Sequence, residues 1–557
     1  SSEEYLKLHE IILKLMINQM INKAKSIAFD KNYSTKTKSE SLMIKQFRQI
    51  LGVKDKRKSI SLLSQLLLNQ YIIEKDKLNL NNSDLLRLMI LSKFSHSESL
   101  VNLKSIYKDF KKEKFTEYLR VKNQIIHSSF TEQNKQKNLN NLINKYIKIS
   151  LQNNRKYLKS NLEYIKNLFN FDEKIVSLIQ SNLTTEQLYI NYYHVKDLDI
   201  LILFSISKNK TNIKLIKNAE NIKKKIEQYV NVINGKKQNF YLNEAYLIKE
   251  KILPKSIIDK RIQNIRVSLD SFLYNVPFSA LPLNQTSAIL FPAKHLSQRG
   301  INNQNLLTYK SSNLKGVKWL GDKYYITYIP STIKFKKDYN TKKDQKLSFL
   351  GIGNPNYKNS NLKLKPLPNT REEILSISKL FNKTNKTLLL DENANEEKLH
   401  KIINNKFDII AFATHGFMSE EYSPTSEPGL ALTNSQNNLF DGYLSSSEVI
   451  SFDLNAKWVL LNACNTFNNQ NPNLNPFSGL PSSFLSAGAE GVMSTLWPIE
   501  TISAKKLSYY SIKNYRKDFN RSKALSLGQK KIREKYSHIW SHPYYWAPYI
   551  NVESTIN

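Results

Sequence analysis

The sequence is poor in cysteine and lacks the short motifs of several large enzyme classes. One Cys among 557 residues excludes an internal disulfide and suits a reducing compartment. A lone Cys is most often a small buried hydrophobe, so it needs a supporting motif before it is treated as a nucleophile. The histidines show no metal-ligand spacing with carboxylates or with the Cys, and no GxSxG elbow or phosphate-binding loop occurs. We therefore expect no metal and no cofactor.

Arginine is also scarce, since only 12 of the 83 basic residues are Arg. The net charge of +36 favours a nucleic-acid partner, because basic side chains dominate phosphate binding. Arg, however, is the side chain preferred for bidentate phosphate and base contacts, and the Lys residues are scattered through Asn- and Ile-rich sequence. We interpret most of the charge as compositional bias and keep a nucleic-acid-binding face as the less favoured alternative.

Long apolar runs are missing too. None is long enough to cross a membrane, and the first residues resemble neither a signal peptide nor a basic targeting segment. We therefore expect a cytoplasmic protein with no membrane partner. The length of 557 residues predicts two or three domains.

The chain divides into three parts by pattern. Residues 1–180 contain no Pro and show helical apolar spacing at 5–28, 59–73, 85–94 and 101–168, which predicts an all-helical region that we call the helical arm. Residues 181–345 change to β-like runs at 188–193, 200–206 and 324–329, with a helix at 219–233. From residue 346 to residue 557, strands and helices alternate.

This last part has the most regular pattern. The expected strands are 347–352, 387–390, 408–413, 458–463 and 491–496, and the expected helices are 371–381, 396–404, 445–450, 480–487, 502–515 and 521–535. Such alternation predicts an α/β fold with a mainly parallel sheet flanked by helices.

Two of these strands end at residues with reactive side chains. FDIIAFATHG, at 407–416, ends its apolar run just before His415, and KWVLLNACNT, at 457–466, does so just before Cys464. Catalytic groups collect beyond the carboxyl ends of parallel strands, so we expect both side chains at one edge of the sheet. A thiol beside an imidazole there would form a nucleophile and base pair.

Further short segments follow in order along roughly the last half of the chain. They are VPFSALP (276–282), YIPST (328–332), GIGNP (351–355), LPNTREEI (367–374), EPGLALT (427–433), DGYLSSSEV (441–449), GLPSSFLSAGAEGVMSTLWPI (479–499) and HPYYWAPY (542–549). Together with THG and NACNT, this succession closely resembles the CHAT family of caspase-like proteins, in the cysteine peptidase group that includes caspases and separases.

The resemblance implies roles for named residues. In that family the His protonates the leaving group, and the backbone N–H groups of the following Gly and of the Cys form the oxyanion hole. His415 and Cys464 are therefore expected to be catalytic, with Gly416 and Cys464 forming the oxyanion hole. Taken alone, His415 could be a hydrogen-bonded strand-end histidine and Cys464 an inert buried thiol, and the ordered motifs favour the catalytic pair.

Specificity is expected to depend on residues near these two. Caspases have Arg and Gly after their Cys, whereas this chain has Asn465 and Thr466, so a preference for Asp is not implied. In separases an acidic residue shortly after the LW element recognises a substrate Arg, and Glu500 is the carboxylate in LWPIETIS. We predict Glu500 and Asn465 as substrate-binding residues. The simpler alternative for Glu500 is a carboxylate stabilised at a helix start by the helix dipole.

The resemblance also suggests how the three parts work together. CHAT proteins commonly carry tetratricopeptide repeats upstream, but the 34-residue signature is not found in residues 1–180, so an irregular helical bundle is as well supported. Residues 181–345 contain no Cys and are expected to form a non-catalytic caspase-like or structural lobe beside the catalytic CHAT lobe at 346–557. The loop 417–427 is expected either to act as a lid or to be an ordinary surface connection.

We therefore expect a cysteine endopeptidase that cleaves a protein substrate. A regulatory protein or complex bound through the helical arm would control it, as in bacterial defence or cell-death signalling. The alternatives are a catalytically inactive CHAT scaffold that gathers partners and a nucleic-acid-associated effector subunit.

Overall fold

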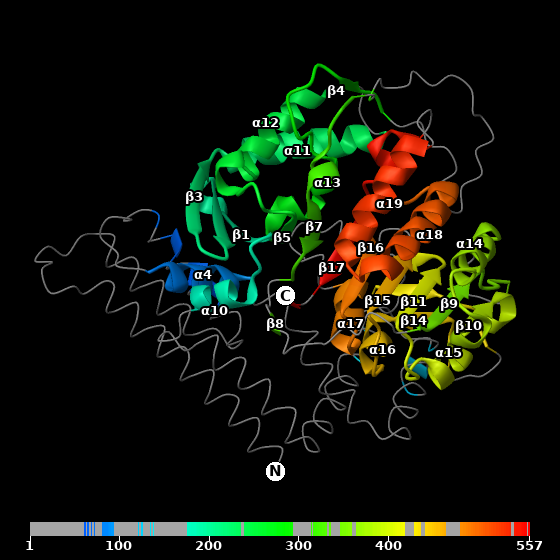
Figure 1. The fold of residues 1–557 in the computed structure, drawn as a ribbon. Coiled ribbons are helices and arrows are strands. Elements are labelled where there is room, and N and C mark those ends of the chain that lie inside the picture. The colour runs from blue at the N-terminus through cyan, green and yellow to red at the C-terminus, as the bar shows by residue number, and fades with distance from the viewer. Residues whose placement is uncertain are drawn as a thin grey trace, which may run out of the picture.

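A computed structural model shows one 11-stranded sheet with helices packed along it (Figure 1). The residues that the structure describes are 81–93, 175–235, 239–292, 314, 316–330, 334–335, 346–358, 364–417, 428–435, 440–463, 479–535, 540–553 and 555–556, with a few single positions between 61 and 138. Most of the predicted helical arm and most of the 417–427 loop lie outside them.

One half of the sheet comes from residues 346–557. Its five neighbouring parallel strands are, in spatial order, β10 (Lys386–Leu390), β9 (Phe349–Gly353), β11 (Ile409–Ala413), β15 (Trp458–Asn462) and β16 (Gly491–Thr495). The helices between and after them are α14 (Asn369–Ser378), α15 (Glu396–Ile402), α16 (Ser446–Ser451), α17 (Leu480–Ala487), α18 (Thr501–Asp518) and α19 (Arg521–Lys535).

Both faces of this half are covered, which explains why its strands are apolar throughout. Every residue of β9, β11, β15 and β16 is buried. Phe412 of β11 packs against Phe484 of α17, with ring centroids 5.4 Å apart. The next residue along, Ala413, faces the opposite side of the sheet, the side on which α14 and α18 lie. Helices therefore enclose the sheet on two sides.

The other half comes from residues 187–328. Its strands are β7 (Tyr325–Tyr328), β5 (Asn264–Ser268), β1 (Gln187–Val195), β2 (Ile200–Ser207) and β3 (Thr211–Lys217), and its main helices are α11 (Ala219–Ile233) and α12 (Leu242–Ile252). β7, β5 and β1 are parallel to one another, and β2 and β3 continue as an antiparallel meander.

The strand β17 (Tyr549–Glu553), near the end of the chain, joins the two halves. It is antiparallel to β16 and parallel to β7, so it lies at the centre of the continuous sheet. The predicted boundary at 345/346 lies between the strands of the two halves, but the sheet itself is continuous across them.

The smaller described elements are α4 (Asn82–Ser92), α10 (Ile175–Asn182), α13 (Leu320–Lys323), β4 (Phe240–Tyr241), β6 (Ile289–Leu290), β8 (Lys334–Phe335), β12 (Gly416–Phe417), β13 (Gly429–Ala431), β14 (Tyr443–Ser445) and β18 (Thr555–Ile556).

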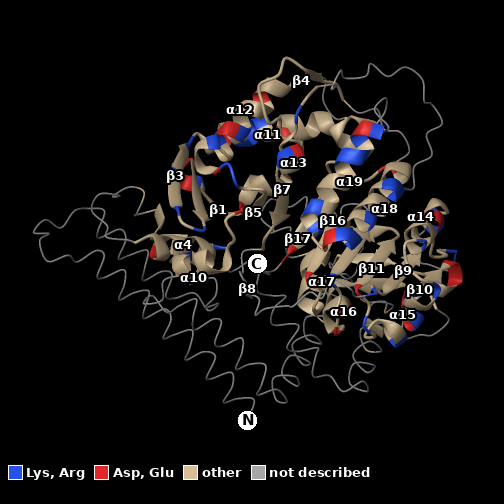
Figure 2. Ribbon diagram, in the orientation of Figure 1, with Lys and Arg blue, Asp and Glu red and all other residues tan. Residues whose placement is uncertain are grey.

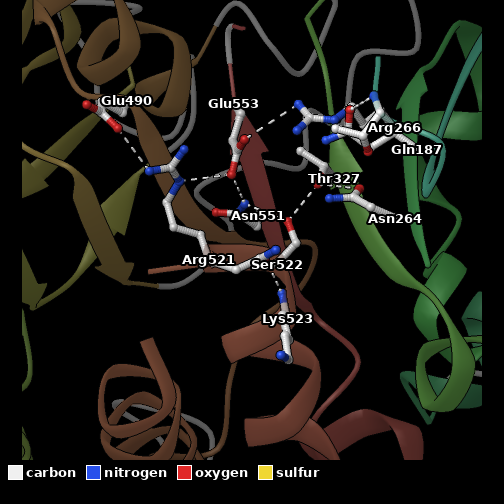
Figure 3. A network of polar contacts seen from close by, with 12 residues as sticks. Gln187, Asn264, Arg266, Thr327, Glu490, Arg521, Ser522, Lys523, Asn551 and Glu553 are labelled. Atoms are coloured by element: carbon white, nitrogen blue, oxygen red, sulfur yellow. Dashed lines mark hydrogen bonds and ion pairs between the residues drawn. The ribbon is translucent and has the colours of Figure 1, made fainter. Parts of the chain in front are cut away.

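A buried polar network stabilises this junction (Figure 3). Arg521, the first residue of α19, contacts Glu553 of β17 at 2.9 Å and Glu490 at 3.1 Å. On the other side, Arg266 of β5 lies 3.8 Å from Glu553. Burial alone would raise the pKa of Glu553, but Arg521 and Arg266 hold it below its ordinary value, so the carboxylate stays charged. The network therefore connects strands from both halves through one residue of β17.

The predicted α/β class with a mainly parallel sheet flanked by helices is confirmed. Part of the arm is described and is helical at α4 and α10. Lys93, which ends α4, places its Nζ 2.9 Å from Asn191 Oδ1 of β1, and burial lowers its pKa to about 8 despite the opposing effect of Asp270. Among the described residues, none of the helices has both the length and the apolar character that crossing a bilayer requires.

His542, in the HPYYWAPY segment, makes the fold sensitive to acid. Its Nδ1 accepts the N–H of Tyr544 at 3.1 Å, so its Nε2 carries the hydrogen that is donated to the Phe291 carbonyl at 2.9 Å. Burial excludes the charged form and lowers the pKa of His542 to about 4, although the bond to Phe291 opposes the shift.

Unfolding should therefore become easier as the pH falls. The folded-state pKa lies below the unfolded-state value, so the stabilisation is complete above pH 6.5 and is lost between pH 6.5 and pH 4. We expect His542 to account for about 3 kcal/mol of the unfolding free energy that is lost in acid. Urea unfolding at pH 7 and pH 4.5 measures it, with His542→Asn as the non-titrating control that keeps a cap for Tyr544. An unchanged pH dependence in that variant would exclude His542 as the cause.

Candidate active site

The strands β11 and β15 bring together the two chain segments predicted to be catalytic. Ile409 pairs with Trp458, and Ala413 at the end of β11 pairs with Asn462 at the end of β15. His415 is the second residue after Ala413 and lies in the described part of the chain. Cys464 is the second residue after Asn462 in the sequence, but it lies outside the described residues, as does Asn465.

The imidazole of His415 is oriented by a backbone carbonyl. Its Nε2 lies 2.9 Å from the carbonyl oxygen of Lys365, in the segment before α14. A carbonyl oxygen can only accept a hydrogen bond, so Nε2 must carry the hydrogen. In the neutral imidazole the lone pair is then on Nδ1, which is the nitrogen able to take a proton.

A small antiparallel sheet holds the backbone around His415. β12 follows His415 directly and pairs with β13, so that Gly416 faces Leu430, and β13 pairs in turn with β14. The N–H of Ala431 donates to the carbonyl of His415 at 3.0 Å. A Cβ at Gly429 would lie 2.4 Å from the ring of Tyr443, so only Gly fits at this crossing. The chain after His415 is therefore fixed by both hydrogen bonds and close packing.

The end of β15 is fixed by polar contacts from three elements. Asn462 is fully buried, and its Nδ2 donates to Glu373 Oε1 of α14 at 2.5 Å and to Ser508 Oγ of α18 at 2.7 Å. One residue further, the carbonyl of Ala463 accepts a hydrogen bond from Thr495 Oγ1 of β16 at 3.0 Å. The two residues that precede Cys464 are thus tied to both neighbouring helices and to the next strand.

Glu500 lies at the start of α18 and is 4% exposed. Its two carboxylate oxygens accept the N–H groups of Ile502 at 2.9 Å and Ser503 at 2.7 Å. This is the arrangement of a helix N-cap, the alternative considered for Glu500 from the sequence. Its predicted role in recognising a basic substrate residue stays a prediction.

Three contributors to the site have no motif of their own in the sequence. They are the carbonyl of Lys365, the hydroxyl of Thr414 and the side chain of Tyr357, whose ring centroid lies 5.2 Å from that of His415. Thr414 was recognisable only as part of THG. Another histidine, His400, is half-buried between the rings of Phe440 and Phe452, with centroid distances of 5.1 and 5.0 Å.

Within the part of the chain that the structure describes, no group of three or more His, Cys, Asp or Glu side chains is arranged to hold a metal ion. The described side chains of the site offer an imidazole, an amide and hydroxyl groups, all held by backbone or buried polar contacts. Of these, Asn462 and Thr414 are fully buried, whereas the partly exposed imidazole of His415 can accept and return a proton.

Comparison with known proteins agrees with the motifs. The family model described as the CHAT domain matches residues 244–554, a stretch that includes both His415 and Cys464. The resemblance seen in the sequence is therefore confirmed. A search of the curated proteins finds no match.

Several solved structures are similar at low identity. A chain of the Saccharomyces cerevisiae separase–securin complex has a TM-score of 0.46 and 11% identity, covering 98% of this chain and 40% of that one. The complex of Porphyromonas gingivalis RgpB pro- and mature domains has a TM-score of 0.31 and 9% identity, covering 60% of this chain and 76% of that one. The Arg specific cysteine proteinase gingipain R (RGPB) has a TM-score of 0.31 and 9% identity, covering 56% and 66%. This chain thus spans less than half the length of the separase-complex chain that it matches.

Proposed function

Since this chain belongs to the CHAT domain family, we propose that it is a cysteine endopeptidase in which Cys464 is the nucleophile and His415 the proton carrier. The observation that carries the proposal is the register of β11 and β15. Ala413 pairs with Asn462, and the proposed catalytic residues each stand two positions beyond this pair. Neighbouring strands are about 4.8 Å apart, so the chain ends of β11 and β15 lie close together. A thiol and an imidazole two positions beyond these ends could therefore form a pair.

The hydrogen bond to Lys365 supports the role of His415. It fixes the ring and leaves the lone pair on Nδ1, which would take the proton of the Cys464 thiol. The resulting thiolate would attack the carbonyl carbon of the scissile peptide bond, and the imidazolium would return the proton to the leaving amine. Water would then hydrolyse the acyl-enzyme, with His415 accepting its proton.

The oxyanion hole is assigned to the N–H groups of Gly416 and Cys464. Gly416 starts β12, whose pairing with β13 holds its peptide plane in one orientation. A residue without a Cβ also lets the substrate carbonyl approach the backbone closely. Fixed donors of this kind stabilise the developing oxyanion without reorganisation.

The substrate of this reaction would be a protein, and we place control of the enzyme in the helical arm, with a regulatory protein as its partner. The contact of Lys93 with Asn191 supports this, because it connects the end of α4 to β1 of the non-catalytic half. Cytoplasmic action and a place in bacterial defence or cell-death signalling belong to the same proposal. Asn465 remains proposed as a substrate-binding residue beside the nucleophile.

A nucleic-acid-associated function finds less support. Figure 2 shows Lys and Arg side by side with Asp and Glu along α11 and α12, whereas α18 and α19 are mainly basic, and some of their basic residues pair with acidic residues of other elements, such as Lys505 with Glu372. Several of these Lys residues form ion pairs, such as Lys223 with Glu220 and Lys225 with Glu244. Ion pairing of this kind weakens the attraction of a surface for phosphate.

Cleavage of a peptide library by the whole protein tests the proposal, with the products identified by mass spectrometry. Cleavage that is lost in both Cys464→Ala and His415→Ala is the expected result. Identical product patterns for the wild-type protein and Cys464→Ala, with and without candidate partners of the arm, would instead indicate an inactive scaffold.

Glu500→Gln separates the two roles considered for Glu500. Gln keeps only part of the cap, so we expect a loss of about 1 kcal/mol in the free energy of unfolding. If Glu500 also binds a basic P1 residue, cleavage after Arg and Lys should fall relative to cleavage after other residues. Lower stability with an unchanged P1 preference would leave Glu500 only the capping role.

A further inference from the structure

Tyr357 contacts the proposed catalytic histidine from a buried position. The residue lies four positions after the end of β9, just beyond the GIGNP segment, and 5% of its surface is exposed. Its ring lies beside the imidazole of His415, with centroids 5.2 Å apart and planes at 57°. Its hydroxyl oxygen lies 2.8 Å from Oγ1 of Thr414, the residue before His415. Tyr357 therefore reaches both the ring of His415 and the backbone that carries it.

The direction of this hydrogen bond follows from the groups around it. Thr414 Oγ1 also lies 2.5 Å from the carbonyl oxygen of Ala431, which can only accept, so the single hydroxyl hydrogen of Thr414 is donated there. Tyr357 must then donate its own hydrogen to Thr414. Ala431 in turn donates its N–H to the carbonyl of His415. The contacts form a directed chain from Tyr357 through Thr414 and Ala431 to the backbone of His415.

The loop that carries Tyr357 is itself fixed. Asn354 adopts a left-handed conformation, with φ of 50°, and its N–H donates to Thr370 Oγ1 at 2.9 Å. The N–H of Asn356 donates to Thr433 Oγ1 at 2.8 Å. β9, which precedes Tyr357, is also the neighbour of β11, which precedes His415. The pairing of these two strands and the hydrogen bonds of the loop therefore hold Tyr357 beside His415.

We propose that Tyr357 is a positioning residue for His415, and this proposal rests on the peptidase function proposed above. Its hydroxyl fixes the turn that carries His415 through Thr414. Its ring keeps the imidazole aligned with the Lys365 carbonyl and stabilises the imidazolium, because an aromatic ring attracts a cation within about 6 Å of its centroid. The thiolate–imidazolium pair, and with it the reactivity of Cys464, would depend on Tyr357.

The single cysteine of the chain makes a direct test available. Alkylation by iodoacetamide, followed by intact mass, reports Cys464 alone, and its rate as a function of pH gives the midpoint of thiolate formation. For the whole wild-type protein we expect a midpoint below the ordinary thiol value of about 8.5. Tyr357→Leu should slow alkylation at pH 6 by about three- to tenfold and move the midpoint upward, as expected when a cation–π contact is lost. Tyr357→Phe keeps the ring and should show a smaller change.

Tyr192→Phe is the matched control. The Tyr192 hydroxyl donates to the carbonyl of Ile252 at 2.7 Å in the other half of the sheet, so this variant loses one buried hydrogen bond far along the chain from His415. It should lose stability but keep the wild-type pH profile. Thr414→Val is a second variant, nearly isosteric with Thr, in case Tyr357→Leu does not fold. It should behave like Tyr357→Phe.

The outcomes separate the two proposals. If His415→Ala has the wild-type alkylation profile, no thiol–imidazole pair exists and the proposed function fails. If His415→Ala differs from the wild type while Tyr357→Leu does not, the pair stands and the positioning role of Tyr357 is excluded. If Tyr357→Leu does not fold, the same decision rests on Thr414→Val and Tyr357→Phe.

Discussion

Replacing His415 by Ala should lower kcat for peptide hydrolysis by about a hundred- to ten-thousandfold, the usual contribution of a positioned acid–base group. Cys464→Ala should remove activity to the background. In the proposed mechanism, thiolate formation and protonation of the leaving amine would both pass through the imidazole, whose Nε2 donates to the Lys365 carbonyl. Initial rates on a peptide selected from the library measure the effect.

A second histidine provides the control for this experiment. His400 lies between the rings of Phe440 and Phe452 in the same half of the sheet. His400→Ala should lower stability while leaving kcat per folded molecule unchanged. If His415→Ala keeps more than about a tenth of the wild-type rate, another group carries the proton.

Replacing Arg521 by Met should cost about 3–5 kcal/mol of unfolding free energy, because it leaves a buried carboxylate without its nearest cation. Arg521 bonds to Glu553, Glu490 and the carbonyl of Lys457, at 2.9, 3.1 and 3.2 Å. Gly491 leaves room for the Arg521 side chain, because a Cβ at position 491 would lie 2.6 Å from the Arg521 Nε. Chemical denaturation of the purified protein measures the loss.

Another basic residue of α19, two positions further along, is a suitable control for Arg521. Lys523 forms an ion pair with Asp518 at 2.8 Å, with the two side chains 38% and 35% exposed. Lys523→Met should therefore cost no more than about 1 kcal/mol. The double replacement of Arg521 and Glu553 by Met should not restore the lost stability, because it takes the Glu553 carboxylate away from the buried Arg266. Equal losses of unfolding free energy for Arg521→Met and Lys523→Met would show that burial does not increase the contribution of the network to stability.

The helices whose apolar spacing and end residues are both visible in the sequence were predictable from it. The helices at 219–233, 480–487 and 521–535 have the predicted bounds, because apolar spacing begins and ends at clear polar or Gly residues. β17 was not predicted. Its residues, Tyr549–Glu553, lack the continuous apolar run by which β11 and β15 were recognised, and its place between β16 and β7 depends on pairing with strands far away in the sequence.

The same distinction applies to the site. His415 stands directly after an apolar strand in a motif, so its type and position were both recognisable. Tyr357 is one of 30 Tyr residues, and although it lies just after the GIGNP segment, that segment does not indicate a contact with His415. Its contact with His415 depends on the left-handed turn at Asn354 and on the pairing of β9 with β11. Such contacts arise from tertiary structure and leave no local pattern.

The proposed mechanism requires Cys464 to be a nucleophile activated by His415. The most direct measurement is labelling with acyloxymethyl ketone probes carrying Arg, Lys, Leu, Met or Asp at P1, with the labelled residue located by peptide mass spectrometry. We expect label on Cys464 of the wild-type protein, no label on Cys464→Ala and much slower labelling of His415→Ala. Equal labelling rates for the wild type and His415→Ala would contradict the claim.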